Sequence, residues 1–315
     1  MAHKLLLMTS CRRTVCCLLV SAVGVAGCSD RPAAKNVDSA ALDEGLPPVT
    51  GSTTATGWDS SAGPVMIVAA SKNPTDAVIV LPGLTDSSLA ATSRFELQGI
   101  ANIPVELFNS RGLVGSSTLQ VSSQASDATG CVNWPTGRLT GSVPLGWRVA
   151  LQKGRAVGLP LDSLENMGPA DSARVVADVV KVALSLSRNA DPAFRGIPFF
   201  VRKGYRLTTG FSSILVAEAV RRINEEANPR EEHLLMLAER SSNNSQYRPA
   251  FHTRSAGAEE SLETSEILGV LRLMRTNRLA IVITFDYEEG GKIGLLERLG
   301  EHNWRLVWKS AYTGC

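Results

Sequence analysis

The fold is decided near the C-terminal end, where residues 279–309 read LAIVITFDYEEGGKIGLLERLGEHNWRLVWK. From Leu279 to Tyr287 every second residue is hydrophobic, which is the period of a β-strand with one buried face. Gly290 and Gly291 then form a two-residue hairpin signal. A second turn at residues 300–303 precedes another alternating run. We therefore predict a three-stranded antiparallel meander over residues 279–310.

Short hydrophobic runs separated by proline and glycine occupy most of the chain after residue 63. Runs of this kind between turn signals are typical of strands. The spacing is too tight for crossover helices, so we expect antiparallel pairing. The predicted strands cover residues 65–70, 77–81, 105–108, 113–121 and 197–207, and the stretch 131–160 continues in the same manner.

One helix is predicted over residues 169–188. Hydrophobic residues from Ala173 to Leu186 recur at three- and four-residue intervals, as they do on one face of a helix. Pro169 suits the first turn, where its missing N–H is not needed. The negative charge of Asp171 complements the helix dipole there.

Residues 211–240 allow two interpretations. Val216, Val220 and Ile223 fit a helix, whereas the four consecutive hydrophobic residues at 234–237 fit a buried strand. Strong helix formers occur throughout the segment, so periodicity does not separate the two. We favour a long β-hairpin that turns at Asn228 and Pro229.

These elements together predict an α+β fold that is predominantly antiparallel β, with the helix near 169–188 and the C-terminal meander. The chain has 315 residues, of which 44% are hydrophobic and 20% charged, a composition typical of a globular protein. We expect residues 63–315 to form a single globular β-rich domain.

The N-terminus has the order of an export signal. Lys4, Arg12 and Arg13 precede a hydrophobic run at residues 15–24, and small residues follow. The run is too short for a transmembrane helix, which needs roughly 20 hydrophobic residues. The ending Val25-Ala26-Gly27-Cys28 resembles the lipobox of bacterial lipoproteins, in which the cysteine becomes a lipidated N-terminus. An ordinary secretory leader and an uncleaved anchor remain as alternatives.

The resemblance to bacterial lipoproteins implies a signal peptide at residues 1–27 and attachment to a membrane through lipid on Cys28. It also implies a cell-envelope location, on the outer membrane facing the periplasm where the cell has one, because Ser29 rather than aspartate follows the cysteine. Residues 28–62 are mostly small or polar and are expected to form a flexible tether. The membrane is therefore a predicted partner, beside an unidentified envelope protein or ligand.

Two of the six cysteines remain for the folded domain, because three lie in the leader and Cys28 carries the lipid. In an oxidising compartment an even number of cysteines favours a disulfide, here between Cys131 and Cys315. Two unpaired buried thiols are the alternative.

The charge balance argues against nucleic acid as a partner. Three of the 32 Lys and Arg residues lie in the leader and none of the 30 acidic residues does, so the mature chain has 29 basic residues against 30 acidic ones. Nucleic-acid binding requires clustered Lys and Arg that neutralise several phosphates.

No local motif predicts catalysis, a metal or a cofactor. The mature chain lacks both the glycine-flanked serine of many hydrolases and a lysine three residues after a serine. The three mature histidines, His233, His252 and His302, are isolated rather than spaced as metal ligands. We interpret Glu231-Glu232-His233 and the other adjacent acidic pairs as solvated turns, and place His252 and His302 beside turns. No phosphate-binding glycine loop follows a strand.

Two further features are open to a functional interpretation. Arg221 and Arg222 face the later glutamates across the proposed hairpin, either as an ion-pair ladder or as an anion-binding cluster. The aromatic residues of the last strand suit either a hydrophobic core, which we favour, or a carbohydrate platform; they are Trp304, Trp308 and Tyr312.

The sequence thus predicts a membrane-anchored envelope lipoprotein whose role is binding or structural rather than catalytic. An extracytoplasmic hydrolase whose site is assembled from distant residues is the alternative, because spacing in the sequence does not exclude a dispersed triad.

Overall fold

The computed structural model describes residues 63–70, 73–82, 97, 99–123, 134–187, 191–210, 212–224, 229–241, 246–258, 261–287 and 290–314. All of them belong to one compact unit, Thr53–Cys315. Antiparallel strands dominate and a helix accompanies them, so the predicted α+β fold is confirmed. Cys28, Cys131 and Cys315, the leader and the tether lie outside the described residues. No helix in the described part of the chain is long and apolar enough to cross a membrane.

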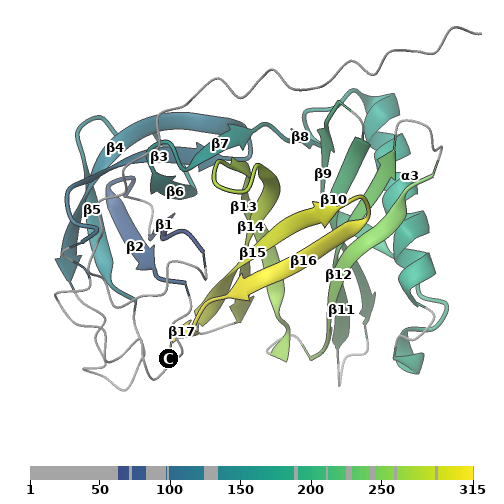
Figure 1. Ribbon diagram of the computed structural model, residues 1–315. Coiled ribbons are helices and arrows are strands. Elements are labelled where there is room, and N and C mark those ends of the chain that lie inside the picture. The colour runs from purple at the N-terminus through teal and green to yellow at the C-terminus, as the bar shows by residue number, and fades with distance from the viewer. Residues whose placement is uncertain are drawn as a thin grey trace, which may run out of the picture. The chain divides into compact units, whose positions relative to one another are not determined.

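The first part of the compact unit is a closed antiparallel barrel (Figure 1). The barrel closes where Ile67 and Val68 of the first strand pair with Ala150 and Val149 of the last. Hydrophobic side chains fill its interior, among them the fully buried Ile79. Its six strands, in spatial order, are β1 (Met66–Ala69), β2 (Asp76–Val80), β5 (Thr136–Thr140), β4 (Gly112–Ser123), β3 (Ile103–Asn109) and β6 (Val149–Gln152).

Two further antiparallel sheets complete the fold. The helix-covered sheet has the order β12 (Arg248–Gly257), β11 (Arg230–Ser241), β10 (Ser212–Ile223), β9 (Phe200–Thr208) and β8 (Asp162–Ser163). The central sheet has the order β16 (Asn303–Lys309), β15 (Gly290–Gly300), β14 (Arg278–Tyr287), β13 (Thr264–Leu273) and β7 (Ala156–Leu159), with β17 (Thr313–Gly314) beside β15.

The central sheet is buried on both faces. Alternate side chains such as Ile281 and Ile283 pack against the helix-covered sheet. The intervening Ala280 and Val282 pack against residues of the barrel. The layers are therefore the helix, the helix-covered sheet, the central sheet and the barrel (Figure 1).

The predicted helix is confirmed as α3 (Pro169–Leu186). Gly168 precedes it, Pro169 lies in its first turn and Asp171 is the acidic residue there. Its buried face contains Val175, Val179, Val182 and Ala183, which pack on the outer side of β10 and β11. A short 3₁₀ helix, η2 (Pro192–Phe194), connects α3 with β9.

The hairpin interpretation of residues 211–240 is confirmed, although the register ends at Ile223 and Arg230 and is therefore not centred on Asn228 and Pro229. β10 pairs with β11 in one continuous antiparallel register from Ser212↔Ser241 to Ile223↔Arg230. Both strands are buried on two faces, because α3 covers one side and the central sheet the other. This double burial explains the hydrophobic run at 234–237, which does not alternate.

The predicted C-terminal meander is correct in its three strands but too small. β14, β15 and β16 pair consecutively, yet the same sheet continues through β13 and β7. The register of β13 shifts between Ile267 and Gly269, and the run Ile267 to Leu271 is buried almost throughout. Because residues 267–271 do not alternate between hydrophobic and polar, the period-two pattern that predicts β14, β15 and β16 does not extend to β13.

A buried carboxylate joins the two sheets. Glu239 of β11 is fully buried and forms an ion pair with Arg298 of β15. It also accepts hydrogen bonds from the backbone N–H of His302 at 3.1 Å and from Nε1 of Trp304 at 3.4 Å. One side chain thus fixes the end of the β15–β16 hairpin to the helix-covered sheet.

Candidate functional site

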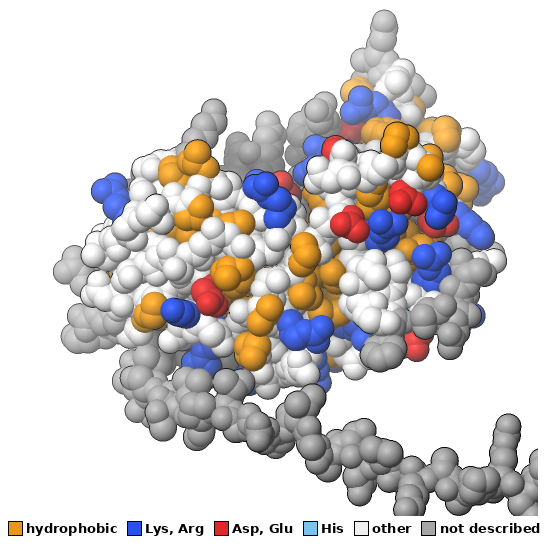
Figure 2. All heavy atoms as spheres, turned by 90° about the horizontal axis from the view of Figure 1, so that it is seen from above, with side chains coloured by type: hydrophobic (Ala, Val, Ile, Leu, Met, Phe, Trp, Pro, Cys, Tyr) orange, Lys and Arg blue, Asp and Glu red, His pale blue; other side chains and the backbone are white. Residues whose placement is uncertain are grey.

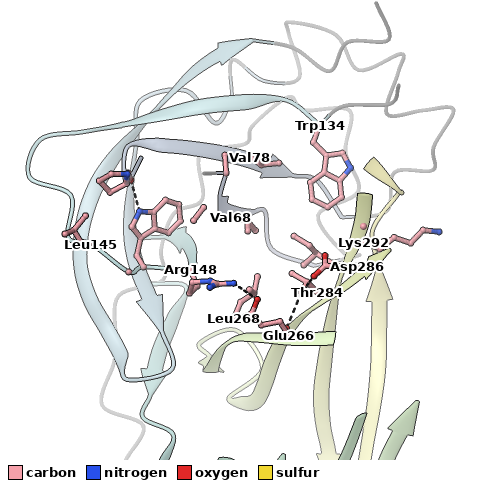
Figure 3. A pocket seen from close by; sticks show the side chains of 17 residues that line it. Val68, Val78, Trp134, Leu145, Arg148, Glu266, Leu268, Thr284, Asp286 and Lys292 are labelled. Carbon is pink, nitrogen blue, oxygen red and sulfur yellow. Dashed lines mark hydrogen bonds and ion pairs between the residues drawn. The ribbon is translucent and has the colours of Figure 1, made fainter. Parts of the chain in front are cut away.

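A cleft of about 660 Å³ lies between the barrel and the central sheet (Figure 3). The barrel contributes β1, β2 and the loop before β6, and the central sheet contributes β13, β14 and β15. Leu145, in the loop of the barrel, is 79% exposed, although it is a large hydrophobic side chain. The cleft therefore offers a hydrophobic surface to solvent.

Most of the lining is hydrophobic, and strand alternation explains why. Val68 and Val78 come from neighbouring strands of the barrel, and Leu268 and Ile293 come from the barrel-facing side of the central sheet. The indole of Trp147 is fixed because its Nε1 donates a hydrogen bond to the carbonyl oxygen of Pro74 at 2.7 Å. Such walls bind the apolar part of a ligand by removing its surface from water.

An ion pair connects the two walls. Nη2 of Arg148, next to β6, lies 2.7 Å from Oε2 of Glu266 on β13 (Figure 3). Nζ of Lys203 on β9 lies 3.8 Å from the other carboxylate oxygen. These groups are roughly a third to a half exposed, so the pair contributes little to stability. For a ligand, the consequence is that Glu266 already has two cationic partners.

Asp286 is the carboxyl group left for a ligand. It lies on β14 beside Thr284, whose Oγ1 donates a hydrogen bond to Oδ2 at 2.9 Å. No ion pair joins it to a cation of the described residues, and the Lys292 side chain points away from it (Figure 3). Burial, with a smaller effect of the nearby Glu266 charge, raises the pKa of Asp286 above its ordinary value.

A second polar cluster lies at the end of the β10–β11 hairpin. His233 is buried, with Nδ1 2.9 Å from Oε1 of Glu218 and Nε2 2.8 Å from Oε2 of Glu231. Burial lowers the pKa of His233, but the hydrogen bonds and charges of the two glutamates outweigh it and raise that pKa overall. Both glutamates also pair with arginines, Arg202 at 3.4 Å and Arg222.

The interpretation of residues 231–233 as a solvated turn is therefore wrong. All three lie within β11 and are buried. The reason is that each charge faces a partner across the hairpin, since Arg221 is opposite Glu232 and Arg222 is opposite Glu231. The ion-pair ladder is confirmed, although the Arg221–Glu232 pair is buried rather than exposed.

The tryptophans and the other histidines that the sequence singled out lie in the cores, in a strand or in a turn. Trp304 and Trp308 are buried in the cores, as favoured over a carbohydrate platform. His302 occupies the β15–β16 turn as predicted, whereas His252 lies inside β12 opposite Met236, so its assignment beside a turn is wrong. The lipidation and disulfide predictions at Cys28, Cys131 and Cys315 concern residues outside those described.

Sequence reasoning missed Arg148, Glu266 and Asp286, which three separate segments bring together. The sequence did contain an indication of Asp286, in the residues that alternate with the hydrophobic positions of its strand. The residues at 280, 282, 284 and 286 change from Ala and Val to Thr and Asp, which indicates that this face leaves the core and meets a polar surface. Nothing local marks Arg148 or Glu266.

Two common catalytic arrangements, a histidine paired with a nucleophile and a metal centre, do not occur among the described residues. None of their three histidines hydrogen-bonds to a hydroxyl or thiol group. No group of His, Cys, Asp and Glu in the same ranges is arranged to hold a metal ion. No protein-family model, curated protein or solved structure matches the chain.

Proposed function

We propose that this protein is a lipoprotein of the cell envelope, attached to the membrane through Cys28, that binds a ligand without transforming it. The observation that carries the binding function is the cleft, because it combines hydrophobic walls with a carboxyl group, Asp286, that forms no ion pair with a described residue. Its ligand has an apolar body and a hydrogen-bond-donating or cationic group. The anchor rests on the lipobox at residues 25–28. In a cell with two membranes, the location is the outer membrane facing the periplasm.

The anchor predicts a loss of lipid and of membrane association in Cys28→Ala. Wild-type protein labelled in cells with a palmitate analogue is expected to carry the label and to sediment with membranes. The variant has no thiol at position 28 to accept diacylglycerol, so it should carry no label. It should also leave the membrane fraction, because stable anchoring needs two acyl chains. Cys131→Ala is the matched control and should keep the label. Equal labelling of Cys28→Ala and wild type would refute the anchor.

The cleft predicts a preference for amines that depends on Asp286. Octylamine, octanol and octanoate present the same chain with different head groups, and their affinities can be compared by isothermal titration calorimetry. A charge-assisted hydrogen bond to a carboxylate is worth about 1.5–3 kcal/mol, so octylamine is expected to bind about tenfold or more tightly than octanoate. Asp286→Asn should abolish this preference, whereas Asp171→Asn on α3 should retain it.

The pH dependence of the amine preference follows from the raised pKa of Asp286. The carboxyl group becomes neutral as the pH falls through that pKa, so the preference should disappear at a higher pH than for an ordinary aspartate. Equal affinity of the three probes, or an unchanged preference in Asp286→Asn, would exclude this carboxyl group as the head-group site.

A hydrolase is the second candidate, and one observation favours it. Glu266 and Asp286 lie on neighbouring strands and line the same cleft, and the charge of Glu266 contributes to the raised pKa of Asp286. Glycosidases use two carboxyl groups whose environments separate their pKa values. Turnover of a chromogenic glycoside by wild type, lost in both Asp286→Asn and Glu266→Gln, would replace the binding function with this one.

A further inference from the structure

Three turns border β7 at the junction of the barrel and the central sheet. The β6–β7 turn at 153–155 and the β13–β14 turn at 274–277 lie together where β7 begins, and the β3–β4 turn at 110–111 lies where β7 ends, since the N–H of Leu161 donates to the carbonyl oxygen of Ser110 at 2.7 Å. The backbone N–H of Met274 donates to the carbonyl oxygen of Arg155 at 3.0 Å. A side chain at Gly158 would collide with the backbone of Leu113. We call this surface, made of the three turns and β7 together with the adjoining Leu113 of β4 and Arg272 of β13, the turn face.

The turn face is strongly basic. It contains Arg111, Lys153, Arg155, Arg272 and Arg275, and none of them forms an ion pair with an acidic side chain of the described residues. Two of them contact neutral groups instead, since Arg155 Nε donates to Gln152 and Arg272 Nη1 to the carbonyl oxygen of Asn277, both at 3.4 Å. Within the described part of the chain, no acidic side chain pairs with these positive charges.

Acidic groups nearby are engaged in other contacts. Glu106 accepts a hydrogen bond from the backbone N–H of Gly154 at 3.1 Å. Glu297 pairs with Arg278 at 3.4 Å. Because the mature chain as a whole is almost neutral, this local excess of positive charge is a property of the turn face and not of the composition.

Hydrophobic side chains protrude among these cations. Leu113 is 57% exposed, Val157 49% and Met274 44%, which makes them three of the most exposed large hydrophobic residues of the described chain. Val157 is the register partner of Arg272 across the β7–β13 pair. Seen from above, hydrophobic and basic side chains alternate over the middle of this side of the molecule (Figure 2).

We propose that the turn face docks on the surface of an anionic lipid bilayer. Arginine and lysine are attracted to anionic head groups, and aliphatic side chains beside them enter the boundary between head groups and acyl chains. A nucleic acid would use the cations but offers no place for Leu113, Val157 and Met274, because single-stranded bases stack on aromatic rings instead. The docking needs no lipid on Cys28, so it stands independently of the proposed anchor.

The test measures vesicle binding of the unlipidated polypeptide that begins at Ser29. This chain retains the whole compact unit Thr53–Cys315. Binding to vesicles of phosphatidylcholine with 40% phosphatidylglycerol, a composition chosen at about the anionic fraction that attracts polybasic surfaces, is compared with binding to pure phosphatidylcholine by co-sedimentation. We expect the protein to sediment with the anionic vesicles and not with the neutral ones, and to be released from the anionic vesicles as the salt concentration rises.

Two variants of the turn face separate its charge from its hydrophobic side chains. Arg111→Gln/Arg155→Gln/Arg275→Gln removes three cations and is expected to weaken binding on the order of 100-fold. Leu113→Ser/Met274→Ser removes the inserting side chains and is expected to weaken it about tenfold or more. The matched control removes charges and an exposed leucine near the opposite layer, as Arg174→Gln/Lys181→Gln/Arg195→Gln with Leu184→Ser, and should bind as wild type does.

Two results would overturn the proposal. One is binding that is equal on neutral and anionic vesicles, or is weakened as much by the control as by the turn-face variants. The other is binding to DNA as tight as to anionic vesicles and unaffected by Leu113→Ser/Met274→Ser, which would assign the surface to polyanions in general. Circular dichroism of each variant verifies that it is folded.

Discussion

Replacing Glu239 with Gln is expected to lower the free energy of unfolding by about 3 kcal/mol or more. The carboxylate is fully buried and its partners are all donors, namely Arg298, the backbone N–H of His302 and Nε1 of Trp304. A glutamine removes the charge that these donors stabilise and turns an N–H₂ group toward at least one of them. Urea unfolding of both proteins measures the difference.

The exposed neighbour Glu301, which is 56% exposed, provides the control. Glu301→Gln alters a charge beside the same turn and is expected to change stability by no more than about 0.5 kcal/mol. An equal effect of both substitutions would show that Glu239 does not join the two sheets in the way described.

The loss of stability in Glu239→Gln is expected to depend on pH. Burial raises the pKa of Glu239, but the hydrogen bonds from Arg298 and His302 and the charge of Arg298 outweigh it, so that pKa lies below its ordinary value. A carboxyl group with a depressed pKa in the folded state stabilises the protein above its unfolded pKa of about 4.3. This stabilisation is lost as the pH falls, so the difference between wild type and Glu239→Gln should shrink below about pH 4.

The strands and the helix were predictable from the sequence, whereas their assembly was not. Hydrophobic residues that recur every two positions in a strand, or every three to four in a helix, show which face of the element is buried. Residues 279–287 and α3 are examples. Closure of the barrel depends on β1 pairing with β6, which joins Ile67 to Ala150 across almost the whole of the barrel's sequence. β12 lacks alternation because most of its residues are partly exposed, and β13 lacks it because both of its faces are covered.

The candidate site was less predictable than the fold. The cleft depends on Arg148, Glu266 and Asp286 meeting across the interface of barrel and central sheet, and only Asp286 belongs to a strand that the sequence predicts. In the charged hairpin, the sequence indicated only that arginines and glutamates lie close together. A hairpin centred on Asn228 and Pro229 would place Arg221 and Arg222 opposite residues 236 and 235, whereas the observed register pairs them with Glu232 and Glu231. The adjacent charged residues at 231–233 suggested an exposed turn. They are buried instead because oppositely charged side chains neutralise one another.

The second large effect is expected from separating Arg221 and Glu232. Their side chains are 4% and 0% exposed, and they form an ion pair on the side of the sheet that α3 and η2 cover. Arg221 also donates from Nη1 to the carbonyl oxygen of Phe194 at 2.7 Å and lies over the rings of Phe194 and Phe199. Glu232→Leu alone leaves the buried Arg221 without its carboxylate, and Arg221→Met alone leaves the buried Glu232 with only the partly exposed Arg254, each at an expected loss of about 3–5 kcal/mol.

The double variant Arg221→Met/Glu232→Leu is expected to be more stable than either single variant, because it buries no charge. Removing both members of a buried pair is often nearly neutral, so urea unfolding of the four proteins should give a coupling energy of at least about 2 kcal/mol. The register neighbour Arg222, 51% exposed, is the control, and Arg222→Gln should cost less than about 1 kcal/mol. Additive losses in the cycle would mean that the two residues stabilise the hairpin separately, through the aromatic contacts of Arg221 and through Arg254, whose Nη1 lies 3.2 Å from Oε1 of Glu232.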